Sequence, residues 1–279
     1  MKVFPFKIPK PQNIGLIYQE DSALYFYDKL HQHEEIQLCT IIKGSGTLIV
    51  GDAISDYKAG DVLVIGSNLP HVFKSNVATK ETSFMISLFF TEVSFGRDFF
   101  KLDDFKELKS FFKKSLFGSK LLSNEQKIQQ HFLALQKASN LKRFIGFFEI
   151  LKLINSSKTK PLADFVSPKK YTDNEGKRMR NIMDYTIRHF NTDITLQKIS
   201  STANISPNAF CRYFKQRTNK TYFSFLNELR IDHACKLLVG NKELSISEIA
   251  FESGFQNISN FNRKFKEVKK TTPSSYRKN

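Results

Sequence analysis

The stretch "SISEIAFESGFQNISNFNRKFKEVKKTTPSSY", which begins at Ser245, repeats the plan of an earlier stretch, "TLQKISSTANISPNAFCRYFKQRTNKTYFSFL", which begins at Thr195. The two copies are offset by fifty positions before the turn and by fifty-one after it, because the second copy has one extra residue there. The residues that return after the turn are Phe210 as Phe261, Arg212 as Arg263, Phe214 as Phe265, and Lys215 as Lys266. A repeat at a fixed period indicates one supersecondary unit that is used twice.

The residues at the ends of each copy predict two short helices joined by a turn. In the second copy, Ser245 followed by Glu248 forms a capping box, and Gly254 tolerates the left-handed backbone at the helix end. The next helix is expected from about Ser259. In the first copy, Asn204 stands in place of Gly254, and Ser206 is the cap of the following helix. Two helices of this kind, the second basic on its outer face, are typical of a helix-turn-helix.

The segment "TYFSFLNELRIDHACKLLVG", from Thr221 to Gly240, separates the two motifs. Its apolar spacing predicts a helix of about eighteen residues that ends at Gly240. Such a helix spans about 27 Å, which is compatible with two recognition helices about one turn of B-DNA apart.

The residues from about Arg178 to Asn279 resemble the DNA-binding domain of AraC/XylS-type transcription regulators. The resemblance covers roughly a hundred residues, and it rests on "SISEIAFESGF", a Phe and an Arg on the second recognition helix, and "TTPSSYRK", in the order and spacing of that family. By position, it implies that seven residues read bases: Asn208, Cys211 and Arg212 on the first recognition helix, and Ile258, Ser259, Asn262 and Arg263 on the second.

The chemistry of these side chains indicates what each one would contact. Arginine suits guanine, asparagine suits adenine, and Ile258 suits the methyl group of thymine. Lysines and helix N-termini are better suited to the DNA backbone, and here these are Ser206, Lys215, Lys264, Lys266 and Thr272. For Arg212 and Arg263, a solvated helix face remains the alternative.

The charge of the chain also favours DNA binding. Its formal net charge is +16, and residues 178–279 hold 18 Lys and Arg against 8 Asp and Glu. Such an excess is expected where cations displace counterions from phosphates, although it also suits a merely soluble basic surface. The three cysteines are too few for a disulfide framework, and no apolar run suits a signal peptide or a membrane span. We therefore expect a cytoplasmic protein.

The N-terminal part, residues 1–98, shows short strand patterns broken by glycine pairs, which predict a β-barrel or sandwich. "HQHEEIQ" and "GDVLVIGSNLPH" resemble the small cupin barrel that commonly precedes the DNA-binding domain in this family. The barrel would gather five polar residues, which we interpret as an effector pocket: His31, His33, Glu35, Gln37 and His71. Structural hydrogen bonding and a metal site remain alternatives. We expect no metal cofactor, because Gln37 stands where metal-binding cupins have a glutamate.

Amphipathic patterns predict a helical segment at residues 99–157. We expect Ser123 to cap the second helix of this segment, and one helix of the segment to form a dimer interface. Polar, proline-containing residues 158–177 predict a linker, and residues 178–279 the double helix-turn-helix domain. The expected fold class is multidomain α and β: an N-terminal cupin-like β-barrel with a helical dimerisation segment, then an all-α domain.

We interpret the chain as a sequence-specific transcription regulator and not an enzyme. Its expected partners are promoter double-stranded DNA, a small-molecule effector, a second copy of the chain and, by family analogy, RNA polymerase. That analogy also favours an activator. The alternative from another class is a cupin metalloenzyme, an oxygenase or isomerase acting through His31, His33 and His71, with a basic helical tail.

Overall fold

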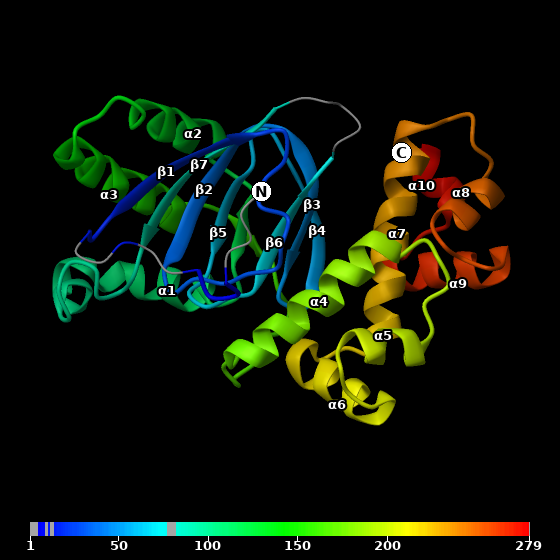
Figure 1. Ribbon diagram of the computed structural model, residues 1–279. Helices are drawn as coiled ribbons and strands as arrows, with labels where there is room; N and C mark the ends of the chain where they lie inside the picture. Colours follow the sequence, from blue (N-terminus) through cyan, green and yellow to red (C-terminus); the bar gives the residue numbers. More distant parts are fainter. Residues whose placement is uncertain (1–4, 9–10, 12–13, 77–81, 279) are drawn as a thin grey trace. The chain divides into compact units, whose positions relative to one another are not determined.

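The computed structural model describes residues 5–8, 11, 14–76 and 82–278. The chain divides into two compact units, residues 1–168 and residues 169–279 (Figure 1). The first unit contains the strands and the second contains only helices, so the predicted fold class is confirmed. Within the described residues, none of the helices has both the length and the apolar character needed to cross a membrane.

The N-terminal unit is built on two antiparallel sheets. The larger sheet has the strand order β1 (Ile17–Ala23), β7 (Ser83–Phe90), β2 (Ile36–Lys43), β5 (Val62–Ile65), β8 (Ser119–Leu121) and β9 (Thr159–Pro161). The smaller sheet has the order β4 (Ala53–Lys58), β3 (Ser45–Val50) and β6 (His71–Ser75). An inner apolar cluster joins the two sheets, with Leu48 and Phe73 from the smaller one packing against Leu63 and Met85 from the larger. The predicted strand region is therefore confirmed.

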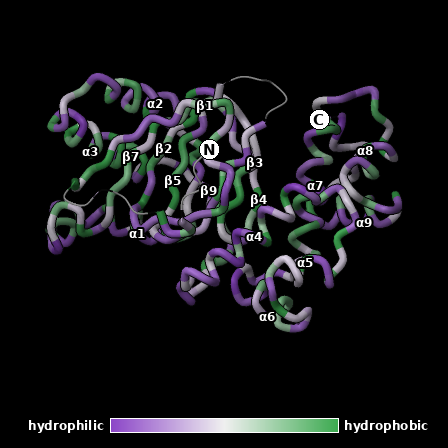
Figure 2. Tube along the Cα trace, viewed as in Figure 1, coloured by the Kyte–Doolittle hydropathy of each residue, from purple (hydrophilic) through white to green (hydrophobic). Residues whose placement is uncertain are grey.

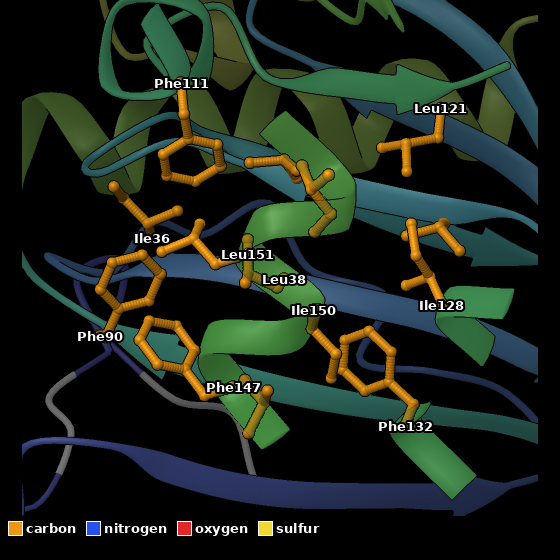
Figure 3. Close-up of a cluster of buried hydrophobic side chains, with 14 of the residues drawn as sticks. Ile36, Leu38, Phe90, Phe111, Leu121, Ile128, Phe132, Phe147, Ile150 and Leu151 are labelled. Atoms are coloured by element: carbon orange, nitrogen blue, oxygen red, sulfur yellow. The ribbon is translucent and has the colours of Figure 1, made fainter. Parts of the chain in front are cut away.

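Three helices cover the other face of the larger sheet: α1 (Lys109–Ser115), α2 (Glu125–Ala134) and α3 (Asn140–Ser156). Two short 3-10 helices, η2 (Phe99–Lys101) and η3 (Asp103–Leu108), precede them. Figure 2 shows hydrophobic stretches along β2, β5 and β7, which these helices bury. In Figure 3, Phe90 of β7 lies against Phe147 of α3, and their ring centroids are 4.7 Å apart. Phenylalanine thus supplies much of this core.

The cap predicted for α2 is wrong by one residue. The cap is Asn124, which has a left-handed φ of 65° and no capping hydrogen bond from its side chain. The Ser123 hydroxyl instead accepts a hydrogen bond from the backbone N–H of Lys158, 2.9 Å away. The Ser123 hydroxyl thus binds the chain next to β9, and Asn124 is the residue that precedes the helix.

The beginning of the predicted linker belongs to the N-terminal unit. Residues 159–161 form β9, and Leu162 and Ala163 are buried in the inner cluster. The carboxylate of Asp52 accepts hydrogen bonds from the backbone N–H groups of Asp164 and Phe165, both at 3.0 Å. These contacts fix the chain as far as residue 165.

The end of the predicted linker belongs to the C-terminal unit. Helix α4 spans Asp173–His189 and so begins five residues before the expected Arg178, behind a capping box formed by Thr172 and Glu175. The Arg217 guanidinium donates to the backbone carbonyls of Lys169 and Lys170. This segment is therefore anchored to its unit from residue 169 onward.

Six further helices complete the C-terminal unit: α5 (Leu196–Thr202), α6 (Pro207–Thr218), α7 (Tyr222–Gly240), α8 (Ile246–Glu252), α9 (Ile258–Lys269) and α10 (Pro273–Lys278). The two predicted helix-turn-helix motifs are α5–α6 and α8–α9. Helix α7 ends at Gly240 as predicted. Its Phe225 packs on Phe214 of α6, with ring centroids 5.8 Å apart, and Ala234 and Leu238 pack in a cluster with α8 and α9.

Arg230, near the middle of α7, connects the segment before the first motif to the turn of the second. Its guanidinium donates to the carbonyls of Phe190 and Thr192, at 2.7 and 2.8 Å, just after α4. It also lies 5.7 Å from the ring centroid of Phe255, in the turn between α8 and α9. One side chain thus contacts the segment before the first motif and the turn of the second.

Candidate nucleic-acid interface and pocket

The first motif has the local geometry that its sequence predicts. Asn204 takes a left-handed φ of 53° in the turn, and the Ser206 side chain caps α6 by accepting from the N–H of Ala209 at 3.4 Å. Proline is the first helical residue, where its missing N–H costs nothing. These features fix where α6 begins and leave its outer face toward solvent.

The second motif follows the same plan, but its turn position accepts only glycine. Ser245 and Glu248 form the predicted capping box, and Gly254 has a φ of +87°. A Cβ atom at Gly254 would lie 2.7 Å from the backbone of Phe190 and Asn191, so only glycine fits without movement. Helix α9 begins at Ile258, one residue before the predicted start, because Asn257 is its cap.

The predicted base-reading residues are exposed, with one exception. Asn208, Cys211 and Arg212 are exposed on α6, and Ser259, Asn262 and Arg263 are exposed on α9. Ile258 is half-buried and packs against the apolar cluster of the second motif. Among the residues predicted for the DNA backbone, those exposed are Ser206, Lys215, Lys266 and Thr272. Lys264 is the half-buried one of this set, with 20% of its side chain exposed.

Two residues that the sequence interpretation missed contact the basic side chains of α9. Asn260 Oδ1 accepts a hydrogen bond of 2.8 Å from the Arg263 guanidinium. The Glu267 carboxylate accepts a hydrogen bond of 2.8 Å from Lys264 Nζ, which holds the pKa of Glu267 below its usual range. The spacing of these residues, three and four positions apart on a predicted helix, is the signal that could have revealed them.

The equivalent side of α6 has a structural role. Tyr213 donates its hydroxyl hydrogen to the carbonyl of Glu175 at 2.7 Å, and the side chain of Arg217 is only 1% exposed, 2.8 Å from the Glu175 carboxylate. Burial alone would raise the pKa of Glu175, but hydrogen bonds from Thr172 and Arg217 outweigh it and lower that pKa to about 2. This side of α6 therefore holds the start of α4.

A separate pocket of about 340 Å³ lies in the N-terminal unit. Its lining includes four of the five predicted effector residues, namely His31, His33, Gln37 and His71, together with apolar residues such as Phe26 and Met85. The ring centroid of His71 lies 4.3 Å from that of His31 and 5.0 Å from that of His33. The sequence prediction that folding gathers the three histidines is thus confirmed.

Glu35 is the predicted pocket residue that is absent from this lining among the described residues. The sequence prediction grouped Glu35 with Gln37 in the pocket, but β2 begins at Ile36 and Glu35 lies in the bend before it. Strand alternation therefore does not reach Glu35. Its backbone carbonyl accepts a hydrogen bond of 2.8 Å from His33 Nδ1 instead.

Hydrogen bonds fix the orientation of the histidines. The Nδ1 atoms of His31 and His71 donate to the carbonyls of Lys29 and Leu69, at 2.8 and 2.9 Å. Since a carbonyl oxygen only accepts, these Nδ1 atoms hold the proton. Gln37 is oriented as well, because its amide donates to Ser87 Oγ at 3.0 Å. No group of three or more His, Cys, Asp or Glu residues suited to a metal ion occurs in the part of the chain that the structure describes.

Comparison with known proteins supports both halves of the interpretation. A family model for a helix-turn-helix domain matches residues 199–279, and one for a cupin domain matches residues 26–89. Over 265 residues, the chain is 26% identical to the uncharacterized HTH-type transcriptional regulator YdeC of Bacillus subtilis (strain 168), a match that covers 90% of this chain and 87% of that protein.

Two further matches cover different extents of the chain. It is 30% identical over 114 residues to the uncharacterized HTH-type transcriptional regulator SACOL0084 of Staphylococcus aureus (strain COL), a match that covers 39% of this chain and only 15% of that protein. Among solved structures, ToxT from Vibrio cholerae O395 is 14% identical and matches 94% of this chain and 97% of its own, with a TM-score of 0.36.

The two motifs and the sheet unit define a DNA-binding transcription regulator with a cupin domain. The two domain matches and the regulator relatives bear out the resemblance to AraC/XylS-type regulators that the sequence implied. The cupin metalloenzyme alternative finds no support among these relatives, whose names describe transcription regulators.

Proposed function

We propose that this regulator is an effector-responsive activator that reads promoter DNA through both recognition helices. The observation that carries the proposal is the packing of both motifs on α7, a helix of 19 residues and so about 28 Å long. That length is close to one turn of B-DNA, and both α6 and α9 present exposed polar and basic residues.

In this proposal, Arg212 and Arg263 read guanine, and Asn208 and Asn262 read adenine. Ser206, Lys215, Lys266 and Thr272 contact phosphates. Ile258 has no side-chain donor or acceptor, so the exposed part of this half-buried residue makes apolar contact with a thymine methyl group. Cys211, which is exposed but a weak donor, contributes by shape more than by hydrogen bonding.

The pocket among His31, His33, Gln37 and His71 is the proposed effector site. Its volume of about 340 Å³ suits a small molecule, and it combines apolar walls with a few oriented polar groups. That combination is usual for ligand pockets, in which apolar contact gives affinity and the polar groups give specificity.

Helix α3 is the proposed dimer interface. Leu141 is 69% exposed and Ile145 is 57% exposed, and they lie four residues apart, one turn along the same side of the helix. A second copy of the chain would bury both side chains in a two-fold interface. A dimer would also double the number of DNA contacts. By family analogy, the activator works in the cytoplasm and contacts RNA polymerase there.

Selection of genomic fragments by the full-length protein tests the proposed function. Fragments from the host genome compete for the protein with an excess of random-sequence DNA. We expect enrichment of a few promoter segments, and an Arg263→Ala variant should enrich them less. Uniform recovery of all fragments by the unmodified protein would contradict sequence-specific reading.

A further inference from the structure

Four residues form a charged stripe along one side of α9. Asn260, Arg263, Lys264 and Glu267 are spaced three and four positions apart, so their side chains lie one above another. The Arg263 guanidinium is 2.8 Å from Asn260 Oδ1 on one side and 3.7 Å from the Glu267 carboxylate on the other. Arg263 is thus held between a neutral acceptor and a carboxylate.

Arg263 also belongs to the face that carries the proposed DNA contacts. Ser259, Asn262 and Lys266 follow this face, and Arg263 lies where it meets the charged stripe. Arg263 and Glu267 are 64% and 57% exposed, so their pairing adds little to the stability of the helix. Any effect of Glu267 on DNA binding can therefore be measured without unfolding the protein.

The Glu267 carboxylate competes with DNA for the same two cations. It lies 2.8 Å from Lys264 Nζ and partly neutralises that ammonium group, and its own charge repels any phosphate that approaches. Non-specific binding depends almost wholly on phosphate contacts, so it is weakened most. A base contact is weakened less, because the guanidinium has five N–H donors and can bond Asn260 and a guanine together.

We propose that Glu267 is a specificity-determining residue, which lowers the affinity of α9 for DNA of any sequence more than for its preferred sequence. Asn260 is its partner as a positioning residue, holding Arg263 toward the base edges. This inference rests on the proposed function of Arg263 in base reading.

The test compares the full-length protein with its Glu267→Gln variant on two duplexes. One is the duplex that the unmodified protein selects from a randomised pool, and the other is of random sequence. Affinities are measured from about 50 to about 200 mM salt. We expect the variant to bind the random duplex roughly five-fold more tightly, with a salt slope steeper by about one, while affinity for the selected duplex changes less.

Glu243→Gln is the matched control, because it removes the same charge from an exposed position between α7 and α8. If Glu267→Gln raises the affinity for both duplexes by the same factor, or by no more than Glu243→Gln does, the inference is overturned. If the unmodified protein selects no preferred duplex at all, sequence-specific reading itself is refuted, and this outcome can be told apart from a failure of the inference about Glu267.

Asn260 variants test the positioning role. Asn260→Ala should lower affinity for the selected duplex roughly five-fold and leave the random duplex unaffected. Asn260→Asp keeps the Oδ1 acceptor, so the ratio of the two affinities should be at least as large as in the unmodified protein, although both affinities fall with the added negative charge. An Asn260→Ala variant with an unchanged ratio would overturn this part of the inference.

Discussion

The recognition helices α6 and α9 follow the same sequence plan, but one side of the helix has a different role in each. At the offset of fifty-one, Arg263 corresponds to Arg212, but the other three residues of the α9 stripe correspond to uncharged residues of α6: Asn260 to Ala209, Lys264 to Tyr213, and Glu267 to Gln216. On α6, this side holds the start of α4 through Tyr213. On α9, it carries a network of exposed charges.

This difference indicates that α6 and α9 contribute differently to DNA binding. Within the described residues, the guanidinium of Arg212 makes no hydrogen bond or ion pair, whereas that of Arg263 has two partners. A guanidinium without protein partners, such as that of Arg212, can reorient to contact phosphates at different positions. A guanidinium held by two partners, such as that of Arg263, favours one orientation relative to the bases. We therefore expect α6 to contribute more to general affinity and α9 more to sequence preference.

The largest expected effect comes from Arg217→Ala. This side chain is 1% exposed and bonds both Glu175 and the chain before α4, so its loss should destabilise the C-terminal unit by about 3 to 5 kcal/mol. The equivalent residue of the second motif, Val268, is half-buried, and Val268→Ala should cost only about 1 kcal/mol. Urea denaturation of both variants measures the difference, and equal costs would refute the asymmetry.

Gly254→Ala should give the next largest effect. The added Cβ would lie 2.7 Å from backbone atoms at a positive φ, which should cost about 2 to 3 kcal/mol. Asn204 holds the same position in the first motif with a φ of 53° and an exposed side chain, so Asn204→Ala should cost about 1 kcal/mol. Thermal unfolding tests both, and an Asn204→Ala variant that unfolds first would contradict the expected order.

Arg263→Ala should weaken binding to the selected duplex by about 1 to 3 kcal/mol and relax the preference at one base pair. Lys266→Ala should instead weaken binding to all sequences alike and reduce the salt slope by about one. Competition with single-base variants of the duplex separates the two outcomes. Identical preference in Arg263→Ala and in the unmodified protein would refute its base-reading role.

The effect confined to the narrowest range of conditions is a dependence of stability on pH. The pKa of Glu175 falls from 4.5 to about 2 on folding, so its contribution is complete above about pH 4.5 and is lost as the pH falls toward 2. The stability difference between the unmodified protein and Glu175→Gln should shrink over that interval. A difference that is constant down to about pH 2 would show that Arg217 does not hold this carboxylate.

The sequence predicted those parts of the fold that depend on local chemistry. The caps at Ser206 and Ser245, the left-handed residues Asn204 and Gly254, and the end of α7 at Gly240 follow from interactions within a few residues, and all are confirmed. Periodicity likewise identified the apolar faces, because burial repeats with the helix or the strand.

What the sequence could not provide depends on contacts between distant segments. Ser123 bonds the chain beside β9, Arg217 anchors a segment about fifty residues earlier, and Glu35 lies in a bend and is not among the residues that line the pocket. No local pattern encodes such pairings. The stripe of Asn260 and Glu267 differs, because the spacing of three and four positions on a predicted helix could have revealed it.

Footprinting with hydroxyl radicals tests the central claim most directly. On the duplex that the full-length protein selects, we predict two protected segments on one face, about 10 base pairs apart, where α6 and α9 enter successive major grooves. Arg212→Ala and Arg263→Ala should each weaken protection at a different segment. A single protected segment for each DNA-binding unit, or loss of the same segment in both variants, would contradict the account.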